Sequence, residues 1–175
     1  MAYYLNTFII YSIMGFLLES SLYKFKSSKC YSGILFGPFT IIYGFGCVFL
    51  SLLDKYFFKK LKINVVFKLI IIYFVSAIVL TLTELSGGII LKYLFHTEMW
   101  NYSSKAFNIG RYICLEMASI WGFMGILFIY LVKPFFDKIF DILTPNFTKC
   151  FTFIILLNLI ISIIIQNKEF ILSFL

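Results

Sequence analysis

Three glutamates lie in or beside long apolar stretches of the sequence, and the chain's one arginine precedes the third of them. These residues are Glu19, Glu84, Glu116 and Arg111. A charged side chain at the centre of a bilayer costs roughly 2.5 to 3.5 kcal/mol on insertion scales, so an acid in such surroundings indicates a functional or pairing site. Buried carboxyl groups can exchange a proton, attract a cation or pair with the planar fork of a guanidinium. The chemistry indicated is therefore ion or solute binding within a membrane.

Glu84 lies in the apolar run 77–91. At helical spacing Ala77, Thr81, Glu84 and Gly88 share one face, and the rest of the run is mostly Ile, Leu and Val. Because this face is small and polar, we expect it to contact protein and not lipid.

The composition indicates an integral membrane protein. Of the 175 residues 62% are hydrophobic and only 13% are charged, and the mean hydropathy is +0.98, whereas soluble domains are about half apolar and a quarter charged. The apolar runs are continuous and do not alternate, which favours helices over a barrel. We predict an all-α, polytopic transmembrane helix bundle forming a single domain over 1–175, with about five spans, roughly at 3–23, 35–53, 69–91, 109–132 and 150–165.

Small residues and lysines refine this prediction. Cys114, Ala118, Gly122 and Gly125 form a small-residue seam that favours close helix packing, and Pro38 suits the first turn of the second span. The net charge is +7, but the lysines crowd the ends of the apolar runs, where they set topology and touch lipid headgroups, so nucleic-acid binding is not indicated. The most basic segment is 54–68.

When the chain is traced through the five spans, its unusual residues fall in one leaflet, towards the side of the membrane that contains 92–108. Arg111 and Glu116 are five positions apart, about 140° around a helix, so we expect Arg111 to pair with Glu84 or Glu19 instead. With three carboxyl groups and one arginine, at least one acid is expected to stay protonated or to await a cation. The predicted binding site comprises Glu19, Glu84, Glu116, Arg111, Tyr43, Trp100, Asn101 and Tyr102.

No catalytic residue, metal site or cofactor is predicted, because the four cysteines form no Cys-x-x-Cys pair and no histidine lies at metal-ligand spacing. Lysines are slightly more numerous on the side that contains the N-terminus and 54–68, which predicts a cytoplasmic N-terminus.

Several motifs resemble the bacterial family called putative ABC-transporter type IV permease, over roughly 11–134. The resemblance is carried by the segments 15–20, 32–38 and 42–46, by Glu84, and by 100–103, 107–115 and 121–122. Asn101 stands where the family pattern has Asp between Trp and Tyr, which removes a carboxylate, and Ile41 and Ile42 stand where it has Pro before Tyr-Gly. The resemblance implies a permease of the bacterial cytoplasmic membrane that works with a separate ATPase subunit.

The leading hypothesis is a membrane transport component that binds a small solute or cation in a polar cavity lined by the glutamates. The sequence has no Walker motif, so a partner would have to hydrolyse ATP. One alternative is an intramembrane enzyme acting on lipid or envelope precursors, in which paired acids do general acid–base work with His96 and Glu98; the sequence has no activated Ser or Cys at motif spacing to favour it. A second alternative is a non-catalytic scaffold or sensor.

Overall fold

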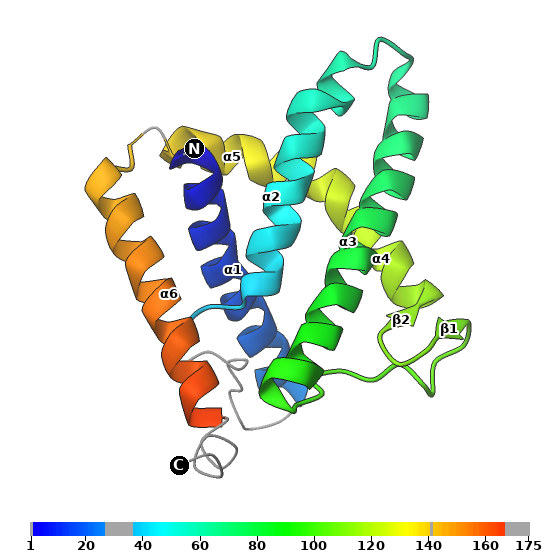
Figure 1. Ribbon diagram of the computed structural model, residues 1–175. Coiled ribbons are helices and arrows are strands. Elements are labelled where there is room, and N and C mark those ends of the chain that lie inside the picture. The colour runs from blue at the N-terminus through cyan, green and yellow to red at the C-terminus, as the bar shows by residue number, and fades with distance from the viewer. Residues whose placement is uncertain (1, 27–36, 141, 167–175) are drawn as a thin grey trace. The chain divides into compact units, whose positions relative to one another are not determined.

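The computed structural model describes residues 2–26, 37–140 and 142–166 (Figure 1). Within these residues, five helical segments are long and apolar enough to cross a membrane. They are α1 (Ala2–Lys26), α2 (Ile41–Tyr56), α3 (Val65–Phe95), the continuous segment Leu115–Phe140, and α6 (Pro145–Gln166). This arrangement confirms the predicted all-α polytopic bundle.

Shorter elements connect or subdivide these helices. A single 3-10 turn, η1 (Phe58–Lys60), follows α2, and a two-stranded antiparallel hairpin, β1 (Asn108–Ile109) and β2 (Ile113–Cys114), precedes the fourth helical segment. That segment consists of α4 (Leu115–Leu127), the π-helical η2 (Phe128–Val132) and α5 (Lys133–Phe140).

Two helix starts follow directly from local sequence. Before α3, the side-chain oxygen of Asn64 accepts a hydrogen bond of 2.9 Å from the Val66 N–H. Before α6, the Thr144 hydroxyl accepts one of 3.3 Å from the Phe147 N–H, and Pro145 occupies the first helical position, where its missing N–H costs nothing. Asn and Thr are typical caps because they satisfy N–H groups that have no partner within the helix.

The second span begins later than the predicted 35, at Ile41. Gly37 has a φ of 125°, a conformation that glycine alone adopts readily and that a helix cannot contain. The Phe39 N–H then bonds the Gly37 carbonyl at 2.9 Å, and the Thr40 N–H bonds the Ser12 carbonyl of α1 at 2.9 Å. Pro38 therefore precedes the helix and does not lie in its first turn.

The fourth span also begins later than predicted, at Leu115 and not at 109. Residues that were assigned to the helix form the hairpin instead, with Asn108 opposite Cys114 and Ile109 opposite Ile113. Gly110 makes the reversal with a φ of 65°. The helix then continues to Phe140, beyond the predicted end at 132.

The described residues belong to two compact units. Unit 1 comprises the described parts of 1–44, 90–99 and 143–175, and unit 2 comprises those of 45–89 and 100–142. The prediction of a single domain stays a prediction.

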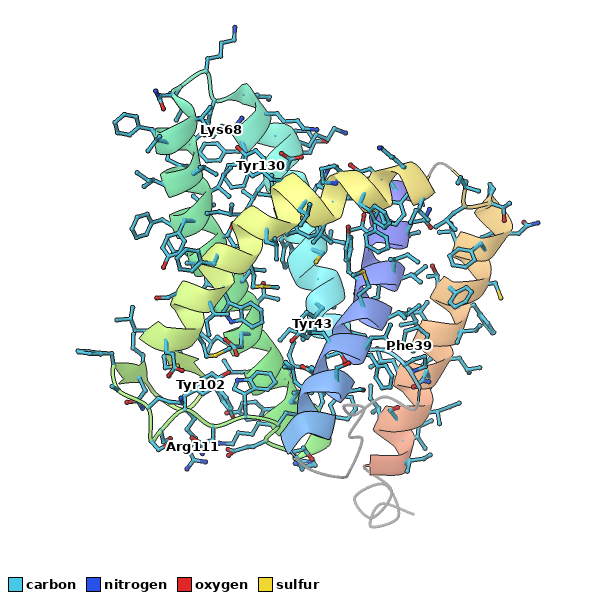
Figure 2. All side chains as sticks on the ribbon, turned by 180° about the vertical axis from the view of Figure 1, so that it is seen from behind. Phe39, Tyr43, Lys68, Tyr102, Arg111 and Tyr130 are labelled. Atoms are coloured by element: carbon cyan, nitrogen blue, oxygen red, sulfur yellow. The ribbon has the colours of Figure 1, made fainter. Side chains whose placement is uncertain are left out.

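Unit 1 has a small apolar core between α1, α6 and the segment that leads into α2. Ile9, Phe39 (labelled in Figure 2) and Ile155 are all buried in it. The Thr148 hydroxyl of α6 donates a buried hydrogen bond of 2.6 Å to the Asn6 side chain of α1. This bond joins helices that are far apart in sequence, as polar side chains do inside membrane bundles.

Unit 2 relies on close approach at glycines. A Cβ added to Gly122 of α4 would lie 2.6 Å from the Tyr73 ring of α3, and one at Gly125 would overlap Ser76. The predicted packing role of the small-residue seam is confirmed at these two positions. In α3, Gly88 allows the same close packing, since a Cβ added there would lie 2.8 Å from the Tyr112 ring.

A buried ionic network joins the end of α2 to α5 in unit 2. Asp54 and Lys133 are only 5% and 8% exposed. The Lys133 Nζ lies 3.3 Å from an Asp54 carboxylate oxygen and 2.8 Å from one of Asp137, and the exposed Lys59 is 3.5 Å from Asp54. This network was not predicted from the sequence, in which Asp54 begins the basic segment 54–68.

We predict that Lys133→Met lowers the free energy of unfolding by about 3 kcal/mol, because it leaves two carboxylates without their buried partner. The matched control Lys138→Met, an exposed lysine of the same helix, should change it by no more than about 0.5 kcal/mol. Thermal unfolding of the purified protein in detergent measures both. Equal stability losses in the two variants would contradict a structural role for the network.

Candidate functional site

The predicted polar face of α3 is buried. Thr81 and Glu84 are 9% and 5% exposed, and Gly88 is buried too. On the opposite side of the helix, Ile78 and Leu82 are 60% and 53% exposed. The prediction that this face contacts protein is therefore confirmed.

The Glu84 carboxyl group accepts hydrogen bonds from two side chains of unit 2. The Tyr102 hydroxyl donates to one oxygen at 2.7 Å, and the Trp121 indole N–H donates to the other at 2.8 Å. Tyr102, labelled in Figure 2, comes from the loop before the hairpin, and Trp121 comes from α4. Three separate segments of the chain thus meet at one acid.

The loop is folded so that Tyr102 faces α3. The Tyr102 N–H bonds the Arg111 carbonyl at 2.7 Å, and the Tyr102 carbonyl accepts from the Lys105 N–H at 2.9 Å. Asn101 is exposed, and its side-chain oxygen accepts a 2.9 Å bond from the Ser103 N–H. This is the turn that Asn and Asp both favour, so Asn101 can replace the aspartate of the family pattern without loss of local structure.

Trp121 is held in place by its neighbour in sequence. Because Gly122 has no side chain, α4 approaches the Tyr73 ring of α3 closely, and this brings the adjacent indole within hydrogen-bonding distance of Glu84. In the sequence analysis, Trp121 occurs only in the segments that carry the family resemblance. Its position next to Gly122 of the small-residue seam was the signal that could have identified it as a residue at a helix contact.

Four buried side-chain polar atoms of unit 2 have no hydrogen-bond partner among the described residues, namely the hydroxyls of Ser51, Ser76 and Thr81 and the indole N–H of Trp100. Of these, the Thr81 hydroxyl is one turn from Glu84 on the same face of α3. The Trp100 ring meets the Tyr112 ring edge to face at 6.3 Å, and Tyr112 packs on Gly88, one turn beyond Glu84. Buried polar groups are seldom left unsatisfied, so the Thr81 hydroxyl and the Trp100 N–H can each make a further hydrogen bond.

The structure places two of the other charged residues of the predicted site, Arg111 and Glu116, on exposed surfaces. Arg111 is exposed in the turn of the hairpin, and Glu116 is exposed in the first turn of α4 (Arg111 is labelled in Figure 2). The Lys105 ammonium lies 2.8 Å from the Glu116 carboxylate, and this hydrogen bond, with the attraction between the charges, raises the pKa of Lys105. The expected pairing of Arg111 with Glu84 is wrong, since the polar contacts of Glu84 come from Tyr102 and Trp121. Its pairing with Glu19 stays a prediction.

Unit 1 contains a second acid bonded to a tyrosine. Glu19 of α1 is half-buried and accepts a hydrogen bond from the side chain of Tyr43, which is labelled in Figure 2. The Tyr43 ring packs on Gly15 of α1, where a Cβ would overlap it. Tyr43 was predicted only as a residue of the binding site, and the structure makes it a hydrogen-bond partner of Glu19. That Glu19 and Glu84 line one cavity stays a prediction.

The arrangement around Glu84 leaves the carboxyl group with capacity for a ligand. Its partners are both neutral donors, and a carboxylate offers about four lone-pair sites, of which two are used here. A phenol and an indole fix the orientation of the group without neutralising its charge. A cation, a proton or a donor group of a solute can therefore still bind to it.

The model of the family described as Putative ABC-transporter type IV matches residues 6–166 of the chain. No curated protein and no solved structure matches this chain. The matched range includes Glu19 and Glu84 together with their hydrogen-bond partners Tyr43, Tyr102 and Trp121. Since the match extends over nearly the whole chain, the protein belongs to the Putative ABC-transporter type IV family.

Proposed function

We propose that this protein is the membrane component of a transport system, and that it binds a small cation or a small cationic solute at Glu84. The observation that carries the proposal is the burial of this acid, 5% exposed, within an apolar helix with only neutral hydrogen-bond donors around it. A carboxyl group in a membrane span is costly to insert, so its presence there indicates a pairing or transport role. The family description supports the transport reading.

The two unsatisfied polar groups close to Glu84 support a ligand at this position. The Thr81 hydroxyl can donate to or accept from a bound solute, and the Trp100 ring offers a face that attracts cations. Tyr102 and Trp121 orient the carboxyl group, so little order is lost when a ligand binds. Glu19 with Tyr43 supplies a second acidic point, in unit 1.

We predict that Glu84→Gln abolishes a fluorescence response to cations. The chain's two tryptophans are Trp100 and Trp121, so in a Trp100→Phe background all indole emission comes from the group that bonds Glu84. Titration of the purified protein with Na⁺, K⁺, choline and spermidine should shift this emission for at least one probe, and the Glu84→Gln variant should lose the shift. The Gln side chain keeps the shape and an acceptor oxygen but not the charge.

The control for this titration is Ser86→Ala, a change at an exposed position of the same helix, which should leave the response intact. A cation response of equal size in the Glu84→Gln variant would contradict binding at this carboxyl group. Absence of any response to the four probes, together with unchanged solute uptake by Glu84→Gln cells, would overturn the proposal as a whole.

We further propose that a separate ATPase subunit supplies the energy, because the sequence contains no Walker motif. The basic segment 54–68 is the proposed contact, through Lys62 in the connection between α2 and α3 and Lys68 in the first turn of α3 (Lys68 is labelled in Figure 2). Purification from native membranes in mild detergent should yield an ATPase in equimolar amount, and Lys62→Gln with Lys68→Gln should reduce its recovery. If the protein is recovered without any ATPase, this proposal fails.

We also propose that the N-terminus lies in the cytoplasm of a bacterial cell, with the loop 100–107 outside. The support is the slight excess of lysines on the N-terminal side, counting those of 54–68. In a cysteine-free background, a membrane-impermeant maleimide added to whole cells should label Ser104→Cys and not Lys62→Cys, both exposed positions. The reverse labelling pattern would show the opposite orientation.

A further inference from the structure

An open apolar groove runs along the end of α2 in unit 2. It is lined by Phe49, Leu52, Leu53, Tyr56, Phe57 and Val79 and has a volume of about 370 Å³. Five of these residues come from α2 and the residue that follows it, and one comes from α3. From Phe49 to Tyr56 the helix rises by about 10 Å at 1.5 Å per residue. The lining therefore extends along about two turns of α2, and it offers almost no hydrogen-bonding group to a polar ligand.

Two lysines stand at one end of this groove. The Lys55 Nζ lies 5.1 Å and the Lys60 Nζ 6.0 Å from the centre of the Tyr56 ring. Tyr56 thus belongs both to the wall of the groove and to a basic cluster, since both ammonium groups lie within cation–π distance of its ring. Both lysines are exposed.

The charge of this cluster is not cancelled by the neighbouring acid. Asp54 is buried and already engaged by Lys133 and Lys59. Among the described residues, the ion pairs contain neither Lys55 nor Lys60. Two uncompensated positive charges therefore mark one end of an apolar groove.

We propose that this groove binds an anionic phospholipid, with an acyl chain along the groove and the phosphate at Lys55 and Lys60. The argument is one of complementarity, because an anionic lipid joins a long apolar chain to a negative group at one end. A zwitterionic lipid has the chain but lacks the net charge. Lysines near an anionic membrane surface each contribute about 1 kcal/mol to its attraction, and the fixed groove adds selectivity for a chain at that position.

The proposal is tested on the full chain in nanodiscs and in mild detergent. The protein is equilibrated with equal amounts of phosphatidylglycerol and phosphatidylcholine, and native mass spectrometry then counts the lipids that stay bound. We expect one phosphatidylglycerol to be retained in preference to phosphatidylcholine. Lys55→Gln with Lys60→Gln should reduce that retention about thirtyfold, because two lysines together contribute about 2 kcal/mol and each 1.4 kcal/mol is a factor of ten.

Two further variants separate the groove from surface charge in general. Lys62→Gln with Lys68→Gln removes the same charge from the same basic segment, 54–68, and should leave lipid retention unchanged. Val79→Phe fills the groove from α3 without any change in charge and should reduce retention by several fold, while a thermal unfolding curve shows that the fold persists. Soluble glycerol 3-phosphate should not displace the lipid, because it has no acyl chain.

The outcomes distinguish a lipid bound in the groove from a general attraction between surface lysines and anionic lipid. If loss of either lysine pair reduces retention equally, the segment 54–68 attracts anionic lipid through charge alone and the groove is not a binding site. If the Val79→Phe variant retains the lipid fully, or if glycerol 3-phosphate displaces it, the acyl chain does not occupy the groove. If phosphatidylcholine is retained as well as phosphatidylglycerol, the headgroup assignment is wrong. None of these results depends on solute binding at Glu84.

Discussion

The packing of unit 2 depends on the hydrogen bonds that one buried carboxyl group accepts. Glu84 lies within α3, most of whose residues are apolar, and an unsatisfied polar group in such surroundings costs several kcal/mol. Tyr102 and Trp121 meet that need from two other segments. The loop before the hairpin and the helix α4 are thus both fixed relative to α3 by the same acid.

Polar pairing recurs wherever the described helices must be joined without a hydrophobic driving force. In a bilayer, apolar side chains gain little by leaving lipid for protein, so small residues and hydrogen bonds determine which helices associate. Thr148 bonds Asn6 in unit 1, and Lys133 pairs with Asp54 in unit 2. The glycines allow the approach, and the polar pairs make it specific.

The helices and the polar face of α3 could be predicted from the sequence because hydropathy and helical periodicity are properties of single segments. The seam at Gly122 and Gly125 was predictable for the same reason. Partners were not predictable, because a hydrogen bond from Trp121 to Glu84 joins residues 37 positions apart, and their spacing carries no signal of it. Arg111 was assigned to an acid on the assumption that its stretch was helical, whereas Gly110 turns the chain there and Arg111 lies in an exposed turn.

The π-helical segment Phe128–Val132 affects more than the shape of its own helix. A wide turn of this kind corresponds to one extra residue within an α-helix, and each residue turns the helix by about 100°. All side chains from Lys133 onward are thereby rotated relative to those of α4. The extra residue therefore determines that Lys133 is the side chain that faces Asp54. A relative of this protein with one residue fewer in that segment would need a different residue to neutralise that acid.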